Sequence, residues 1–172
     1  MATLVLTVMG DDRPGLVDTL AGVVAAHGGN WEQSRMAHLA RKFAGILLVS
    51  VPDEQAASLH AALDALHTGG VLHVMVEHGG KPQAPGHRRL SLELLGQDRA
   101  GIVHDIAHAL AERGVSIEEL ETGTRSASMG GGTLFHAKAI LLAPENVPMH
   151  ELEGVLEALA NELMADIELA QE

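Results

Sequence analysis

The chain of 172 residues contains no cysteine and no tyrosine, and only one tryptophan and two phenylalanines. Without cysteine, disulfide bonds and thiolate metal ligands are excluded. The core must therefore be built from Leu, Val, Ile, Ala and Met, which bury less area per residue than aromatic side chains. We expect cores of modest size.

Long apolar runs are also absent. No stretch of 18 consecutive apolar residues occurs, and the N-terminal segment MATLVLTVMGDD has neither a basic region nor a long apolar one. These features predict neither a membrane-spanning helix nor a secretory signal peptide. We expect a cytoplasmic protein with no membrane partner.

Basic side chains are scarce. The chain has 11 Lys and Arg against 23 Asp and Glu, a formal net charge of −12, and its only adjacent basic pairs are Arg41-Lys42 and Arg88-Arg89. Affinity for a phosphate backbone depends on clustered basic side chains that release counterions. We therefore expect no direct binding to nucleic acid, and any control of genes to run through a protein partner.

The sequence contains an internal repeat. The segments GDDRPGLVDTLAGVVAAHG (10–28) and GQDRAGIVHDIAHALAERG (96–114) are identical at about eight of nineteen positions, without a gap. A duplication of this kind predicts two domains, 1–78 and 88–172, separated by a linker over 79–87 that is rich in Gly and Pro.

Hydrophobic periodicity gives both halves the same element order. In the first half we expect strands at 3–9, 30–39, 43–51 and 71–77 and helices at 14–29 and 53–67. In the second half we expect strands at 88–95, 115–126, 133–143 and 165–170 and helices at 100–114 and 149–163. A βαββαβ order with right-handed crossovers predicts an α+β fold: two ferredoxin-like domains, each a four-stranded antiparallel sheet with both helices on one face.

The repeated turn carries the candidate chemistry. Asp12 is placed to cap the following helix, Pro14 fits its first turn, and Gly15 removes a Cβ from it. This leaves backbone N–H groups exposed at a helix N-terminus, where a carboxylate can bind. The alternative interpretation is that Gly15 lets the helix approach the sheet closely. Arg13 and Arg99 are either carboxylate clamps or members of surface ion pairs.

The motifs DRPGLV and DRAGIV, each followed by a Gly and by NWE or SIEE at the next strand, resemble those of ACT domains. The first half is similar to the glycine cleavage system transcriptional repressor family, whose members carry two ACT domains, and this resemblance covers nearly the whole chain. It implies a ligand-binding site of twelve residues: Asp11, Asp12, Arg13, Pro14, Gly15, Leu16 and Asn30 in the first half, and Asp98, Arg99, Gly101, Ile102 and Ser116 in the second. Ala100 departs from the pattern, so the two halves are expected to be unequal.

The resemblance implies a non-catalytic regulator that senses a small amino acid, with glycine as the favoured effector. It also implies a protein partner, a LysR-type transcription factor, and a homodimer formed through edge strands. Two other classes remain open: a fragment related to formyltetrahydrofolate deformylase, and a ligand-free oligomerisation module. Calorimetric titration with amino acids separates these classes.

No metal or cofactor is expected. His104 and His108 lie four residues apart, a spacing that can hold zinc, with Asp105 or Glu112 in reach. There is no His-Glu-x-x-His motif around them, so surface histidines are the favoured interpretation.

Overall fold

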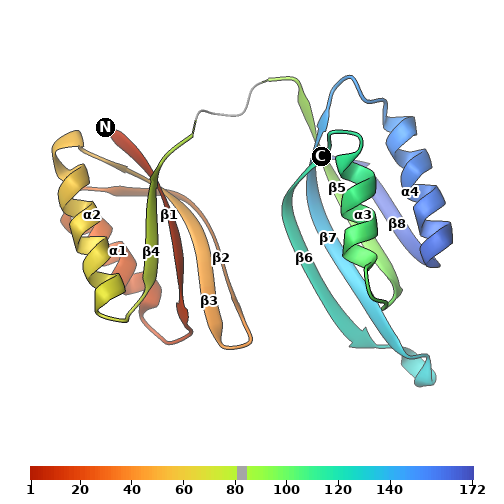
Figure 1. Cartoon of the computed structure of the whole chain (residues 1–172), viewed down its shortest axis with the longest axis horizontal. Helices are drawn as coiled ribbons and strands as arrows, with labels where there is room; N and C mark the ends of the chain where they lie inside the picture. Colours follow the sequence, from red (N-terminus) through yellow and green to blue (C-terminus); the bar gives the residue numbers. More distant parts are fainter. Residues whose placement is uncertain (81–84) are drawn as a thin grey trace. The chain divides into compact units, whose positions relative to one another are not determined.

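The computed structural model describes residues 1–80 and 85–172. The chain forms two compact units, Met1–Pro82 (unit 1) and Gln83–Glu172 (unit 2). In each unit a single sheet carries two helices on one face (Figure 1). This arrangement confirms the predicted pair of ferredoxin-like domains.

Both sheets have the same strand order and are antiparallel throughout. Unit 1 consists of β1 (Ala2–Asp11), α1 (Leu16–Ala26), β2 (Asn30–Leu39), β3 (Lys42–Val51), α2 (Asp53–Thr68) and β4 (His73–His78). Its sheet order is β2-β3-β1-β4. Unit 2 consists of β5 (His87–Gln97), α3 (Ile102–Ala111), β6 (Ser116–Ser126), η1 (Ser128–Gly130), β7 (Thr133–Pro144), α4 (Met149–Leu163) and β8 (Ala165–Gln171). Its order is β6-β7-β5-β8.

Several predicted boundaries differ from the structure by up to three residues, and two of these differences concern the linker and the turn before α1. Strand β5 begins at His87, the last residue of the predicted linker, and residues 81–84 of that linker lie outside the described residues. Helix α1 begins at Leu16 instead of Pro14, because a separate turn precedes it.

Each unit buries an aliphatic core between its sheet and its helices. In unit 1, alternate residues of β1 face inward (Leu4, Leu6 and Val8) and meet residues spaced along α1 (Leu16, Leu20 and Val24). In unit 2 the matching residues are Leu90, Leu92 and Leu94 with Ile102, Ile106 and Leu110. Among the described residues, both phenylalanines, Phe43 and Phe135, are buried in these cores. Among the same residues, no helix has the length and apolar character to cross a bilayer.

The β2–β3 hairpin closes through a strained turn. Its two turn residues, Ala40 and Arg41, have φ of 48° and 66°. A two-residue hairpin turn with both φ values positive normally uses Asn-Gly, because side chains with a Cβ disfavour this backbone region. In unit 2 the corresponding connection is longer, as the sequence predicted, and contains η1.

At the same end of the sheet, Asp11 on β1 lies directly opposite Lys42 on β3. The Lys42 ammonium donates a hydrogen bond to the Asp11 carboxylate. This hydrogen bond and the charge of Lys42 lower the pKa of Asp11 below its usual range. The pair holds the end of β1 against the start of β3.

Replacing Arg41 by glycine is expected to stabilise unit 1. Arg41→Gly relieves the left-handed strain at φ 66° and raises the free energy of unfolding by about 1 kcal/mol. Chemical denaturation measures the change. As a control, Ala61→Gly at an exposed position of helix α2 should lower stability by about 1 kcal/mol. Equal destabilisation by both substitutions would contradict the strain at residue 41.

Replacing Lys42 by glutamine is expected to return the pKa of Asp11 toward its usual range, because the charged hydrogen-bond donor is replaced by a neutral one. NMR titration of the Asp11 carboxyl carbon measures the shift. Since the folded-state pKa lies below the unfolded value, the pair stabilises the fold above the unfolded pKa and loses this effect as the pH falls through the folded pKa. An unchanged pKa in Lys42→Gln would show that the pair does not form.

Candidate functional site

The predicted site residues of each repeat centre on the turn between the first strand and the first helix. In unit 1 this turn spans Asp12 to Gly15, and Gly15 adopts φ 90° and ψ 1°. In unit 2 Gly101 adopts φ 86° and ψ 1°. These are the angles of the second central residue of a type II turn, a position that glycine fills, and proline favours the position before it. Pro14 occupies that position in unit 1 and Ala100 in unit 2.

The structure corrects the predicted roles of Asp12 and Pro14. Helix α1 has Gly15 as its N-cap residue with no side-chain hydrogen bond, so Asp12 does not cap it and Pro14 lies outside it. Asp12 instead donates its backbone N–H to the carbonyl oxygen of Arg41 at 2.9 Å. Asp98 makes the same bond to Thr133 at 2.9 Å. The turn is therefore anchored to the neighbouring hairpin.

Neither interpretation fully explains the glycine at position 15. A Cβ built on Gly15 meets no atom within 4 Å, so close approach of helix and sheet does not explain the glycine. The space around the turn is open, as the ligand interpretation requires, but glycine is demanded by the left-handed φ. The same holds for Gly101. A bulky substitution at either position strains the backbone, and therefore does not separate folding from binding.

The helix N-terminus itself is available at this turn. The first intrahelical bond runs from the Thr19 N–H to the Gly15 carbonyl oxygen at 2.9 Å. The N–H groups before Thr19 have no partner inside the helix and point to the side of the turn. The side chains of Leu16 and Ile102 point the other way, into the cores, with 3% of their surface exposed. These two predicted site residues can offer only backbone groups to a ligand.

The two turn arginines differ. In unit 2 the Arg99 guanidinium forms an ion pair with the carboxylate of Asp105 on α3. The position in α1 that matches Asp105 in the repeat is Thr19, which carries no charge. Within residues 1–80 and 85–172, no carboxylate lies at ion-pair distance from Arg13, and Asp11 beside it pairs with Lys42. The surface-pair interpretation therefore fits Arg99, and the clamp interpretation fits Arg13.

Asn30 and Ser116 lie away from these turns within their units. Asn30 pairs with Ser50, and Ser50 pairs with Thr3 near the start of β1, whereas the turn follows Asp11 at its end. Eight residues of strand separate the two levels, about 26 Å at about 3.3 Å per residue. Ser116 likewise aligns with Leu142 and Arg89, at the far end of β5 from Asp98. The predicted ligand-binding residues of each unit therefore do not all lie together within that unit.

Sequence reasoning missed two residues at the turn of unit 1. Lys42 neutralises Asp11, and the carbonyl of Arg41 holds the Asp12 N–H. The hairpin predicted over 30–51 contained the signal, because antiparallel pairing of the first and third strands places the hairpin turn beside the end of the first strand.

The described residues contain no cluster of three or more side chains suited to hold a metal ion. The rings of His104 and His108 stack with centroids 5.8 Å apart, and His108 lies 3.5 Å from Glu112. Two hollows of unit 2, one around β8 and one between α3 and β6, are lined by none of the predicted site residues. The candidate site is thus an open turn.

Comparisons with known proteins agree with this architecture. Models of the ACT domain match residues 2–77 and residues 90–138. Over 163 residues the chain is 26% identical to the glycine cleavage system transcriptional repressors of Escherichia coli K12 and Shigella flexneri, which covers 94% of this chain and 86% of each relative.

A crystal structure of an unknown protein from Galdieria sulphuraria has the same fold. It superposes with a TM-score of 0.84 at 29% identity, and the match covers 99% of this chain and 98% of that one. The two family matches fall on the two units described above. The chain therefore belongs to the ACT-domain family and carries two ACT domains in tandem.

Proposed function

We propose that this chain is a non-catalytic regulator that binds a small amino acid, with glycine as the favoured effector, and acts through a protein partner. Its similarity to two glycine cleavage system transcriptional repressors supports a role in controlling that system. Two ACT domains in one chain support the binding of an amino acid.

The observation that carries this proposal is the difference between the two turns. A free amino acid is a zwitterion and needs a cation for its carboxylate and an anion for its ammonium group. In unit 1, Arg13 precedes the N-terminus of α1 in the turn, and no carboxylate of the described residues lies within ion-pair distance of it. In unit 2, the Arg99 guanidinium already forms an ion pair with the Asp105 carboxylate. Unit 1 therefore offers the better site for a carboxylate.

Asp12 supplies the matching anion. Its neighbour Asp11 is engaged by Lys42, whereas the side chain of Asp12 is exposed and its backbone is fixed by the bond to Arg41. Adjacent opposite charges at a fixed turn fit the two ends of one small zwitterion. The ligand carboxylate then gains charge-assisted hydrogen bonds from Arg13 and from the helix N-terminus.

Regulation through this site follows from linkage. A ligand shifts an equilibrium between two states only by its difference in affinity for them. The acidic balance of −12 opposes direct contact with nucleic acid. The regulator therefore acts on a DNA-binding protein, for which a LysR-type transcription factor is our proposal, and it does so as a homodimer.

Glycine is expected to raise the melting temperature. At about one hundred times its dissociation constant it adds about 2.7 kcal/mol to the folded state, which raises the midpoint of a chain of this size by about 5–10 °C. Glycinamide lacks the carboxylate and acetate lacks the ammonium group, so neither should have this effect. A flat melting temperature with every amino acid at millimolar concentration would favour a ligand-free oligomerisation module.

Replacing Arg13 by glutamine should weaken glycine binding by about tenfold or more, because the carboxylate loses a charged hydrogen-bond donor. Isothermal titration calorimetry measures the loss. Arg99→Gln is the matched control in unit 2, and Asn30→Ala is a second control at the far end of the sheet. Both should retain binding. Loss of binding in either control with Arg13→Gln unaffected would remove the site from the turn of unit 1.

The purified protein is expected not to bind operator DNA at physiological salt. Its charge of −12 and its lack of a basic cluster provide no counterion release. An electrophoretic mobility shift without any partner checks this expectation. Sub-micromolar binding by the isolated chain would contradict indirect action.

A further inference from the structure

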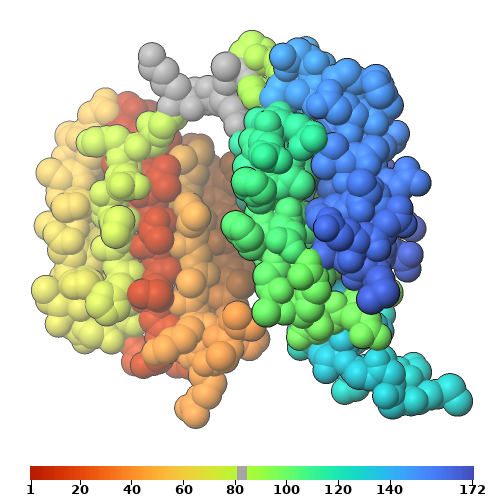
Figure 2. Space-filling view, turned by 45° about the vertical axis from the view of Figure 1, so that its right-hand side comes forward, coloured from red at the N-terminus to blue at the C-terminus, as the bar shows by residue number. Residues whose placement is uncertain are grey.

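The sheet of unit 1 has one face that its helices do not cover. Strands β4, β1 and β3 lie side by side there, and Figure 2 shows them as neighbouring stripes. Their outward side chains are uncharged in the middle of the sheet and form what we call the apolar face: Val5, Thr7, Met9, Ala44, Ile46, Leu48 and Met75. Three of these large side chains are more than half exposed, Met9 at 53%, Ile46 at 55% and Met75 at 62%.

Unit 2 shows that the fold does not require such a face. The central row Met75, Thr7 and Ile46 of unit 1 corresponds in register to Glu168, Glu93 and Lys138 in unit 2. There Lys138 and Glu93 form an ion pair at 3.7 Å. The same backbone thus accepts charged side chains at these positions, so the apolar residues of unit 1 are not needed for its own folding.

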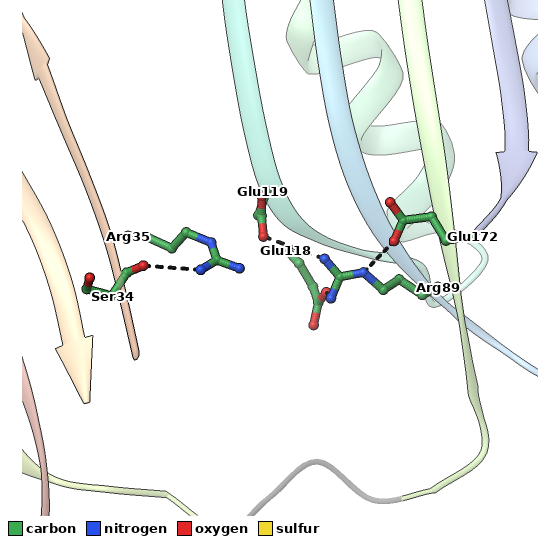
Figure 3. A network of polar contacts seen from close by, with 6 residues as sticks. All are labelled: Ser34, Arg35, Arg89, Glu118, Glu119 and Glu172. Atoms are coloured by element: carbon green, nitrogen blue, oxygen red, sulfur yellow. Dashed lines mark hydrogen bonds and ion pairs between the residues drawn. The ribbon is translucent and has the colours of Figure 1, made fainter. Parts of the chain in front are cut away.

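A second group of charged side chains lies on the uncovered face of unit 2, beside uncharged ones such as Ile140 on β7. The Arg89 guanidinium lies 3.3 Å from Glu118, 3.6 Å from Glu119 and 2.6 Å from Glu172 (Figure 3). The hydrogen bond to Glu172 and these neighbouring charges raise the pKa of Arg89. These four charged side chains are partly exposed, between 30% and 46%.

We propose that the apolar face of unit 1 is the interface through which two copies of this chain associate. A two-fold axis brings the same surface of both copies together, so an uncharged face is complementary to itself. If the partner surface carried the charged residues found in unit 2, association would bury Glu93, Lys138 and Glu168 away from water, which is costly. At a net charge of −12 per chain, two copies repel each other least where the contact carries no charge.

The surroundings of the face fit an interface. Polar side chains border it, with Gln33 and Arg35 on β2 and Glu77 on β4. An apolar centre with a polar border is the usual composition of a protein interface. The apolar face lies on the flat side of strands β4, β1 and β3, which distinguishes this dimer from the edge-strand dimer expected from the sequence.

The size of the face predicts a dimer of moderate affinity. Three strands about 4.8 Å apart and about five residues long give an area on the order of 250 Å². This is slightly below the largest apolar patches on monomers, about 300–600 Å², and is about a third of what each partner contributes to a standard interface. We expect a dimer that dissociates in the micromolar range.

The inference rests on the homodimer of the proposed function but not on ligand binding. If glycine does not bind, the apolar face can still be a dimer interface. If the chain is monomeric, the turn of unit 1 can still bind a ligand. The two experiments therefore fail independently.

Sedimentation velocity of the full chain without ligand, from about 1 to 200 µM, tests the proposal. We expect the mass to rise from one chain to two. Ile46→Lys, which installs the residue that unit 2 carries at this position, should weaken the dimer at least about tenfold. Leu120→Lys is the control, since Leu120 lies on β6 of unit 2 and is 48% exposed.

Three results would overturn the proposal. They are one-chain mass at the highest concentration, a dimer unaffected by Ile46→Lys, and a dimer weakened equally by Leu120→Lys. A monomer that Ile46→Lys nevertheless destabilises in thermal melts would mean that the face is covered within one chain, which also overturns it. Should Ile46→Lys fail to fold by circular dichroism, Ile46→Thr keeps the β-branched shape and should weaken the dimer by a smaller, measurable factor.

Discussion

Both units depend on the left-handed glycine that connects the central strand to the first helix. At Gly15 and Gly101 the chain leaves the sheet and reverses direction within a few residues, with φ of 90° and 86°. Only this backbone brings Leu16 and Ile102 into the cores directly after the turn. The same turn leaves the first N–H groups of the helix open to solvent. One steric requirement thus produces both the packing of the helix and the candidate site.

Duplication preserved the backbone and changed the side chains that face outward. At the turn, unit 2 pairs Arg99 with Asp105, whereas unit 1 has Thr19 at the matching position. On the uncovered sheet face, unit 2 carries Lys138 where unit 1 carries Ile46. Both differences leave unit 1 with groups at its surface that the described residues do not partner: Arg13, which forms no ion pair, and the apolar face, which its own helices do not cover. In unit 2 the matching cations, Arg99 and Lys138, each have a carboxylate partner.

Strand β1 connects the two surfaces of unit 1. Its end at Asp11 leads into the turn, and its middle supplies Val5, Thr7 and Met9 to the apolar face. The turn is also bonded to the β2–β3 hairpin through the Asp12 N–H and the carbonyl of Arg41, and β3 supplies Ile46 and Leu48 to the same face. A ligand at the turn would therefore contact the two strands on which association depends, which gives linkage between them a physical route.

The sequence alone determined the fold. Periodicity, the repeat and the glycines after each first strand predicted both sheets and all four helices, because these signals are local in the chain. It also identified the turn and its arginines. Only the tertiary structure decided that Asp12 binds Arg41 through its backbone, that Arg99 is occupied and that Asn30 lies at the far end of the sheet. These facts depend on the register between strands distant in sequence and on side-chain direction, which no local pattern specifies.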